Sequence, residues 1–229
     1  MSQLRWRLIF GEKDVHLQDF DGKEIRTFQK SDFRISGGRY RVTESLLGEI
    51  SGNLLIEIDV PIEVEVTFEA QINANVRGAT AHASASGAEA YATAPGAIVW
   101  ANESGAEAYA NAYGAEAHAN ADGAKAYADK YEATARATTR GAEAYATADG
   151  AIARATTPGA KAYATANGAE AYATRRGAYA HANADGAKAY AIASGAKAYA
   201  NVKDAIADVG APGAIAYAYA PGALATPLS

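Results

Sequence analysis

The chain has 229 residues, a formal net charge of −5 and no cysteine. The charge is evenly spread: residues 1–77 hold 13 acidic and 10 basic side chains, and residues 78–229 hold 13 and 11, which argues against a nucleic-acid partner. The absence of cysteine excludes disulfides and thiolate metal sites. No apolar run reaches the length of a membrane span or has the form of a signal peptide, so we expect no membrane insertion.

The first 68 residues contain most of the large apolar side chains. Strand-like runs such as LRWRLIF and RYRV are separated by the turn sequences DFDGKE and SGGRY. From Ile56 to Val76 apolar residues occupy every second position, the spacing of one face of a strand. We therefore predict a small β-rich domain over residues 1–68, which caps the rest of the chain and attaches it to a partner.

A nine-residue repeat begins at Gly78 and continues for 17 units. Position 1 is glycine except at Glu132 and Asp204, position 2 is always alanine, and positions 4 and 6 are nearly always alanine. Such strict alternation is typical of β-strands and not of an alanine helix or a disordered Ala/Gly chain. Residues 69–77 read as a degenerate first unit, so we predict a β-solenoid over residues 69–229.

The corners of the solenoid lie at position 9 and the glycine that follows it. Asp-Gly and Asn-Gly pairs there also suit a hairpin, but Pro95 and Pro158 take the same place. Proline fixes φ near −65°, so the pattern indicates a turn with negative φ first and positive φ at glycine. This favours parallel coils over an antiparallel meander, although the sequence leaves both arrangements open, as well as an intertwined oligomer.

The number of units per coil follows from position 5. In every second unit from Tyr91 this position holds seven tyrosines in eight, whereas the other units have only two in nine. The underlying period is therefore 18 residues, which predicts about eight coils with two nine-residue sides each. Two sheets faced with alanine methyls leave a very thin core. Because so thin a core contributes little burial, we expect copies of the chain to associate, for example as a trimer.

The outward columns are the candidate binding surfaces. The tyrosine column is a flat aromatic strip that fits either a glycan or ladder packing within the sheet: Tyr91, Tyr109, Tyr127, Tyr145, Tyr163, Tyr199 and Tyr217. Position 7 has five consecutive threonines from Thr138 to Thr174. Position 3 mixes Glu and Lys, and three of the four histidines replace tyrosine at position 5, which indicates ladders and not catalytic or metal sites. We expect the chain to have no enzymatic activity and to bind no metal and no cofactor.

A folded head followed by a regular rod resembles bacteriophage tail or head appendages and repetitive surface adhesins. The resemblance implies a structural or adhesive fibre on a virion or an extracellular surface, or otherwise in the cytoplasm, with a virion or cell-surface protein bound through residues 1–68. The threonines resemble those of insect ice-binding proteins, although bulky and charged neighbours replace the paired threonine ranks. The alternatives are therefore a solenoid that binds a glycan through tyrosine or ice through threonine.

Overall fold

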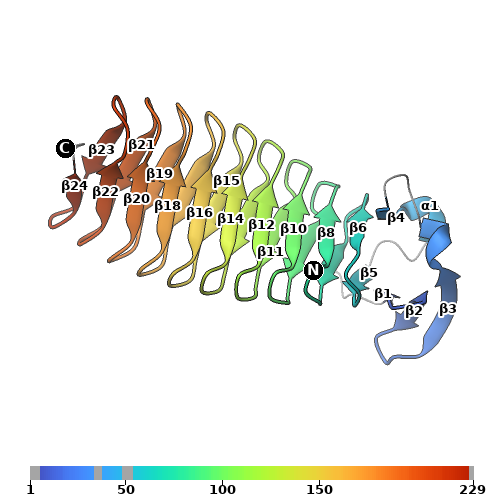
Figure 1. Cartoon of the computed structure of the whole chain (residues 1–229). Helices are drawn as coiled ribbons and strands as arrows, with labels where there is room; N and C mark the ends of the chain where they lie inside the picture. The colour runs from blue at the N-terminus through green and yellow to red at the C-terminus, as the bar shows by residue number, and fades with distance from the viewer. Residues whose placement is uncertain (1–5, 34–37, 48–53, 227–229) are drawn as a thin grey trace.

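The structure is a computed structural model that describes residues 6–33, 38–47 and 54–226. It is a rod of parallel strands stacked into a β-solenoid of about ten turns spaced by 18 residues (Figure 1). The predicted fold class and coil length are thus confirmed. The antiparallel alternative is wrong for the repeat, because all neighbouring repeat strands in each sheet pair in parallel and in register.

The head is built from short elements at one end of the rod. Strand β1 pairs antiparallel with β2, which pairs antiparallel with β3, while β1 lies parallel to β5. The elements are β1 (Trp6–Phe10), β2 (Asp14–Asp19), β3 (Glu24–Gln29), a 3₁₀ turn (Lys30–Phe33), β4 (Tyr40–Val42), α1 (Glu44–Leu47), β5 (Leu54–Ile58) and β6 (Glu63–Val66).

Successive repeat units alternate between two sheets. Sheet A has 13 strands and contains β1, β2, β3 and β5 followed by β7 (Gln71–Ala74), β9 (Glu89–Ala92), β11 (Glu107–Ala110), β13 (Lys125–Ala128), β15 (Glu143–Ala146), β17 (Lys161–Ala164), β19 (Tyr179–Ala182), β21 (Lys197–Ala200) and β23 (Ile215–Ala218). Sheet B has 11 strands and contains β4 and β6 followed by β8 (Thr80–Ala83), β10 (Ile98–Ala101), β12 (Glu116–Ala119), β14 (Thr134–Ala137), β16 (Ile152–Ala155), β18 (Glu170–Ala173), β20 (Lys188–Ala191), β22 (Ile206–Val209) and β24 (Leu224–Thr226).

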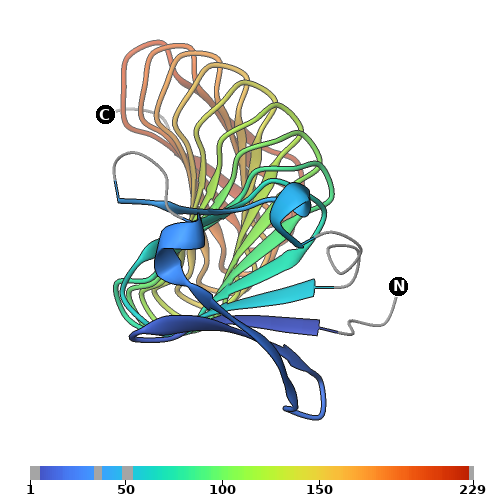
Figure 2. The same cartoon turned by 90° about the vertical axis from the view of Figure 1, so that its right-hand side faces the viewer.

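Both sheets run without a break from the head into the repeat. Strand β5 pairs with β7, and β6 pairs with β8, so hydrogen bonding continues across the boundary placed at residue 68. The 17 units from Gly78 supply β8 to β24, and the strands before them add further turns to the eight predicted from the repeat alone. Viewed from the head, the flattened coils lie over one another and rotate gradually along the stack (Figure 2).

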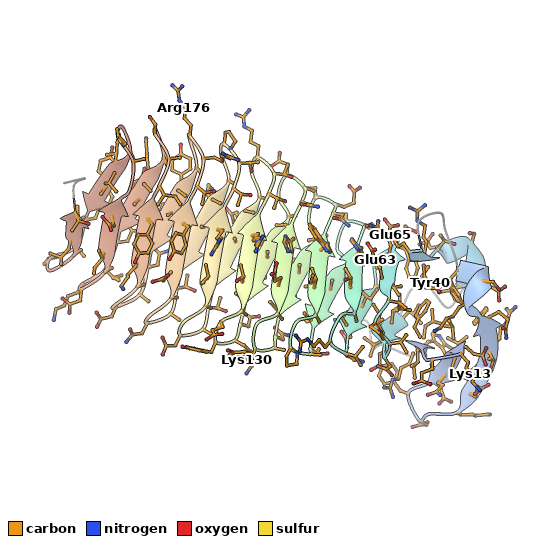
Figure 3. All side chains as sticks on the ribbon, viewed as in Figure 1. Lys13, Tyr40, Glu63, Glu65, Lys130 and Arg176 are labelled. Carbon is orange, nitrogen blue, oxygen red and sulfur yellow. The ribbon has the colours of Figure 1, made fainter. Side chains whose placement is uncertain are left out.

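The core narrows from large side chains to methyl groups along the rod. In the head and the first coils, residues such as Phe10, Phe33, Ile56 and Ile72 are fully buried, and the Phe10 and Phe33 rings are 5.2 Å apart. From Ala79 to Ala207, positions 2, 4 and 6 are 0% exposed, and Val99 is the one residue among them larger than alanine. Figure 3 shows the same change, with crowded side chains in the head and few in the stalk.

The corners have the predicted geometry. In each one the amide of position 2 donates to the carbonyl of position 8, as Ala97 does to Ala94 at 3.1 Å. Glycine at position 1 has φ between +61° and +83°, as in a type II turn. Glu132 and Asp204, which replace glycine, both adopt φ of +57°, a region that L side chains enter at a cost.

Asp204→Gly is expected to raise the free energy of unfolding by about 0.5–1 kcal/mol, because it removes the left-handed strain at an exposed corner. Gly177→Ala is the matched reverse change, since its φ is +75° and a methyl group there would meet no atom within 4 Å. It should lower the unfolding free energy by about 1 kcal/mol. Urea unfolding measures both, and midpoints that move in the same direction would contradict the explanation.

Candidate functional site

All seven tyrosines of the predicted strip lie in one column on the outer face of sheet A. Neighbouring strands pair these positions directly, as Tyr109 pairs with Tyr91 and Tyr127. Ring centroids are 4.8 Å apart from Tyr91 to Tyr109 and 4.8 Å from Tyr109 to Tyr127, with planes tilted by 7° and 8°. His181 stacks at 5.0 Å and 4.7 Å on its two neighbours and completes the column. The ring spacing equals the distance between strands of a sheet, so register alone produces the stack.

Three phenol groups of the column donate hydrogen bonds to carboxylates on their own strands. Tyr91 Oη donates to Glu89 Oε2 at 2.6 Å, and Tyr109 and Tyr145 donate to Glu107 and Glu143. Two position 3 carboxylates in turn accept lysine across one coil: Lys125 lies 3.5 Å from Glu107, and Lys161 lies 3.2 Å from Glu143. Position 3 and position 5 of sheet A therefore form one connected ladder of rings, phenols and charges.

From Tyr91 to Tyr163 this environment raises the pKa of the phenols and so favours their protonated form. Burial, together with Glu107, Asp129 and Glu143, raises the pKa of Tyr127 to about 12. Burial and the hydrogen bond to Glu89 raise the pKa of Tyr91 well above its usual value. The rings are half-buried, and within the column their faces contact neighbouring rings. What reaches solvent is ring edges and hydroxyl groups, so the strip does not offer the open aromatic face on which a sugar ring stacks.

The five consecutive threonines do not form one array. Because successive units alternate between sheets, Thr138, Thr156 and Thr174 lie on sheet B, whereas Thr147 and Thr165 lie on sheet A. Each hydroxyl donates to a backbone carbonyl one coil earlier, as Thr147 does to Ala128 at 3.1 Å. Threonine here closes internal hydrogen bonds and belongs to both faces of the rod.

Sheet B contains a second column that the tyrosine count does not reveal. Trp100 stacks on His118 with ring centroids 3.9 Å apart, and on His82 at 5.9 Å. Both histidines are 6% exposed. Glu63 Oε1 lies 2.7 Å from His82 Nε2 but is not aligned as a hydrogen-bond acceptor. Sequence reasoning placed these histidines in a ladder, and the structure identifies its partner as Trp100.

A groove of about 660 Å³ opens beside this column, where the head meets the stalk. Figure 3 marks Glu63 and Glu65 at this junction. Four of the charged side chains that line the groove form ion pairs, because Arg39 lies 2.5 Å from Glu63 and Arg41 lies 2.8 Å from Glu65, and Glu103 adds a further carboxylate to the lining. Burial raises the pKa of Glu65, but hydrogen bonds from Arg41 and Ser84 outweigh this and leave it below its usual value. Most of the charge in the groove is thus held in ion pairs within the protein.

We expect acid to quench the fluorescence of Trp100 with a midpoint below pH 6.5. Burial lowers the pKa of His118, and Arg136 lowers it further. A protonated imidazole in contact quenches indole emission more strongly than a neutral one. The measurement uses Trp6→Phe, which leaves Trp100 as the sole tryptophan. His118→Gln should remove most of the transition, and what is left is due to His82, whose ring lies 5.9 Å from that of Trp100. A midpoint above pH 6.5 would contradict the assignment.

The described residues contain no group of three or more histidine, aspartate or glutamate side chains placed to hold a metal ion. Within the same residues, no helix is long and apolar enough to cross a membrane. Searches against protein families, curated proteins and solved structures returned no match to the chain.

Proposed function

We propose that the chain is a structural, adhesive fibre protein whose repeat is a stalk and whose residues 1–68 attach the stalk to a virion or cell-surface protein. The observation that carries the proposal is that the outward-facing side chains contact one another along the rod and form ladders within the protein. Tyrosine rings, phenols and threonine hydroxyls are bonded to the neighbouring coil or to their own strand. Such columns stiffen a rod and leave little chemistry for turnover.

The same proposal includes association of several copies. Four of the eight large apolar side chains exposed in the described residues gather in the last coils: Ile192, Ile215, Tyr219 and Leu224. Ile192 and Leu224 lie on the side of sheet B, and Ile215 and Tyr219 lie on the side of sheet A, so both faces expose apolar side chains at this end of the rod. Exposed apolar surface of this kind is typical of a contact between chains. We place the protein in a virion appendage, such as a phage tail or head fibre, because an elongated stalk with a distinct attachment end fits that task.

Light scattering combined with small-angle X-ray scattering on the intact chain tests the proposal. The expected result is an elongated particle of at least two copies whose mass does not change on dilution into the nanomolar range. A stable monomer would overturn the oligomeric fibre. For the virion assignment, antibodies against residues 78–229 should label an appendage in electron micrographs of intact particles, and unlabelled particles that lack the chain would overturn it.

The tyrosine strip as a glycan site is the alternative, and the same preparation tests it. Tyr127→Ala and Tyr145→Ala open the ring faces of their neighbours without touching the alanine core. If the strip binds a glycan, both changes should abolish binding on a glycan array. Under our proposal no tyrosine-dependent binding appears, and the two variants lose stability only.

A further inference from the structure

The arginines of the stalk lie on one side of the rod. Residues 78–229 contain five of them, which we call the arginine patch: Arg136, Arg140, Arg154, Arg175 and Arg176. Arg136 and Arg154 occupy position 5 of β14 and β16 on sheet B, and the other three lie in the turns that follow β14 and β18. Figure 3 shows Arg176 on one edge of the rod and Lys130 on the opposite edge.

Three arginines of the head are paired with carboxylates, and Arg26 lies over the Phe28 ring, whereas arginine in the patch is mostly unpaired. Arg7 pairs with Glu57 at 2.5 Å, as Arg39 and Arg41 pair with Glu63 and Glu65. In the patch, Arg136 has Glu116 at 3.4 Å. No carboxylate among the described residues lies within 4.0 Å of the charged nitrogens of the remaining four, whose side chains are all exposed: Arg140, Arg154, Arg175 and Arg176.

The register of sheet B adds an unfavourable contact. Arg136 and Arg154 are directly paired on neighbouring strands, about 4.8 Å apart at the backbone. Like charges opposite each other destabilise a sheet. Position 3 of sheet A shows that this fold accommodates alternating charge, as with Lys125 between Glu107 and Glu143. The two adjacent guanidinium groups therefore repel each other, and among the described residues the one carboxylate within 4.0 Å of the pair is Glu116, beside Arg136.

Several contacts hold the patch in place. The Arg154 guanidinium carbon lies 5.5 Å from the centre of the Tyr172 ring, in a cation–π contact. The side chains of Arg140 and Arg176 lean over Gly159 and Gly195, the corner glycines one coil further on. Arg136 Nε is buried, so the ligand-facing donors are the exposed guanidinium groups of the other four arginines. Exposed guanidinium groups that are held in place and have no carboxylate partner are suited to an anionic ligand.

We infer that the arginine patch binds an acidic glycan, a saccharide chain with carboxylate or sulfate groups. Guanidinium forms paired hydrogen bonds with the oxygens of such groups, which an ammonium group does not. The patch covers three coils and about four residues of strand, roughly 10 Å by 13 Å, which matches about two or three anionic groups. The carboxylates of Asp122, on the preceding corner, and Glu170, on β18, lie at the borders of the arginine patch. A long nucleic acid that extends past the patch would therefore meet repulsion on both sides.

This inference rests on the adhesive part of the proposed function, because it gives the stalk its ligand. The intact chain is tested by biolayer interferometry against a heparin-derived hexasaccharide and a hexamer of galacturonic acid, with maltohexaose as the neutral probe and a 20-nucleotide single-stranded DNA as the other polyanion. The patch variant carries Arg154→Gln, Arg175→Gln and Arg176→Gln. The matched variant carries Lys125→Gln, Lys161→Gln and Lys197→Gln, which removes the same charge from sheet A.

We expect at least one acidic hexasaccharide to bind in 150 mM salt, with at least tenfold weaker binding by the patch variant and less than twofold change in the lysine variant. Replacing the same three arginines with lysine should also weaken binding several-fold. Equal losses in both glutamine variants, or no binding of either acidic hexasaccharide, would overturn the inference. DNA bound as tightly, with the same arginine dependence, would overturn the glycan assignment. None of these binding results depends on the molecular mass measured by light scattering, so the fibre proposal is tested separately.

Discussion

Ala144→Leu is expected to lower the free energy of unfolding by about 3 kcal/mol. Ala144 is 0% exposed in the middle of β15 and is flanked in register by Ala126 and Ala162. The two sheets are separated by methyl groups alone at this level, so the three additional carbon atoms can enter only by pushing strands apart. A shift in one coil also strains the hydrogen bonds to the coils on both sides.

Thr147→Leu is the matched control, because Thr147 follows β15 directly but is exposed. It loses a hydroxyl that contacts both the Ala128 carbonyl and the Asp129 carboxylate. Because this hydroxyl has one proton to donate at an exposed site, the change should alter stability by no more than about 1 kcal/mol. Urea unfolding followed by circular dichroism measures both variants. If Ala144→Leu unfolds at the same urea concentration as the native chain, the core has room for a larger side chain. That result would contradict the description of an interior only two methyl groups thick.

Raising the pH should unfold the rod in a cooperative step between about pH 10 and 12. Unfolded tyrosine ionises near pH 10, whereas burial and the nearby carboxylates raise the pKa of Tyr127 to about 12. Below pH 10 both states are protonated and the ladder contributes its full stability. As the pH rises from 10 to 12 the unfolded chain loses protons that the folded chain keeps, so stability falls. Phenolates in adjacent rings would also repel each other.

Absorbance at 295 nm reports tyrosinate, and circular dichroism of the same samples reports the sheets. We expect both signals to change together, and the chain in concentrated denaturant to titrate near pH 10 as the reference. If most phenols ionise near pH 10 while the sheets remain intact, the stacked column does not protect its hydroxyls. Tyr127→Phe removes one phenol from the column and should move the transition to higher pH.

The main features of the fold were predictable because each follows from the spacing of particular residues. Alternating alanines predict strands, Pro95 and Pro158 before glycine argue against the hairpin turn, and the tyrosine period of 18 gives a coil with two sides. The ladder interpretation of the histidines follows from the same count. All four conclusions use residues that recur at a fixed interval, and in a parallel stack in register such residues contact one another directly.

Other features depend on how the chain crosses from one sheet to the other. The threonines from Thr138 to Thr174 look continuous in sequence, yet alternate units place them on opposite faces. The same alternation brings Arg136, Arg154 and Arg175 to one side, although acidic and basic residues are nearly balanced along the chain. In the head no repeat is present, so the parallel pairing of β1 with β5 could not be read from local patterns.

The in-register pairing of identical rungs also determines which insertions and deletions the rod tolerates. Loss of residues 141–158 removes one complete coil, joins Arg140 to Gly159 at an ordinary corner, and returns every later side chain to its former face one rung lower. Loss of residues 141–149 preserves the corners and the alanine core equally well, but exchanges the two faces for the whole remainder of the chain. Arg154 would then stack beneath Tyr127, and Tyr163 would move to the arginine side. The rod can therefore gain or lose two units at a time and keep each side chain on its face. A change of one unit instead exchanges the side chains of the two faces in every later coil.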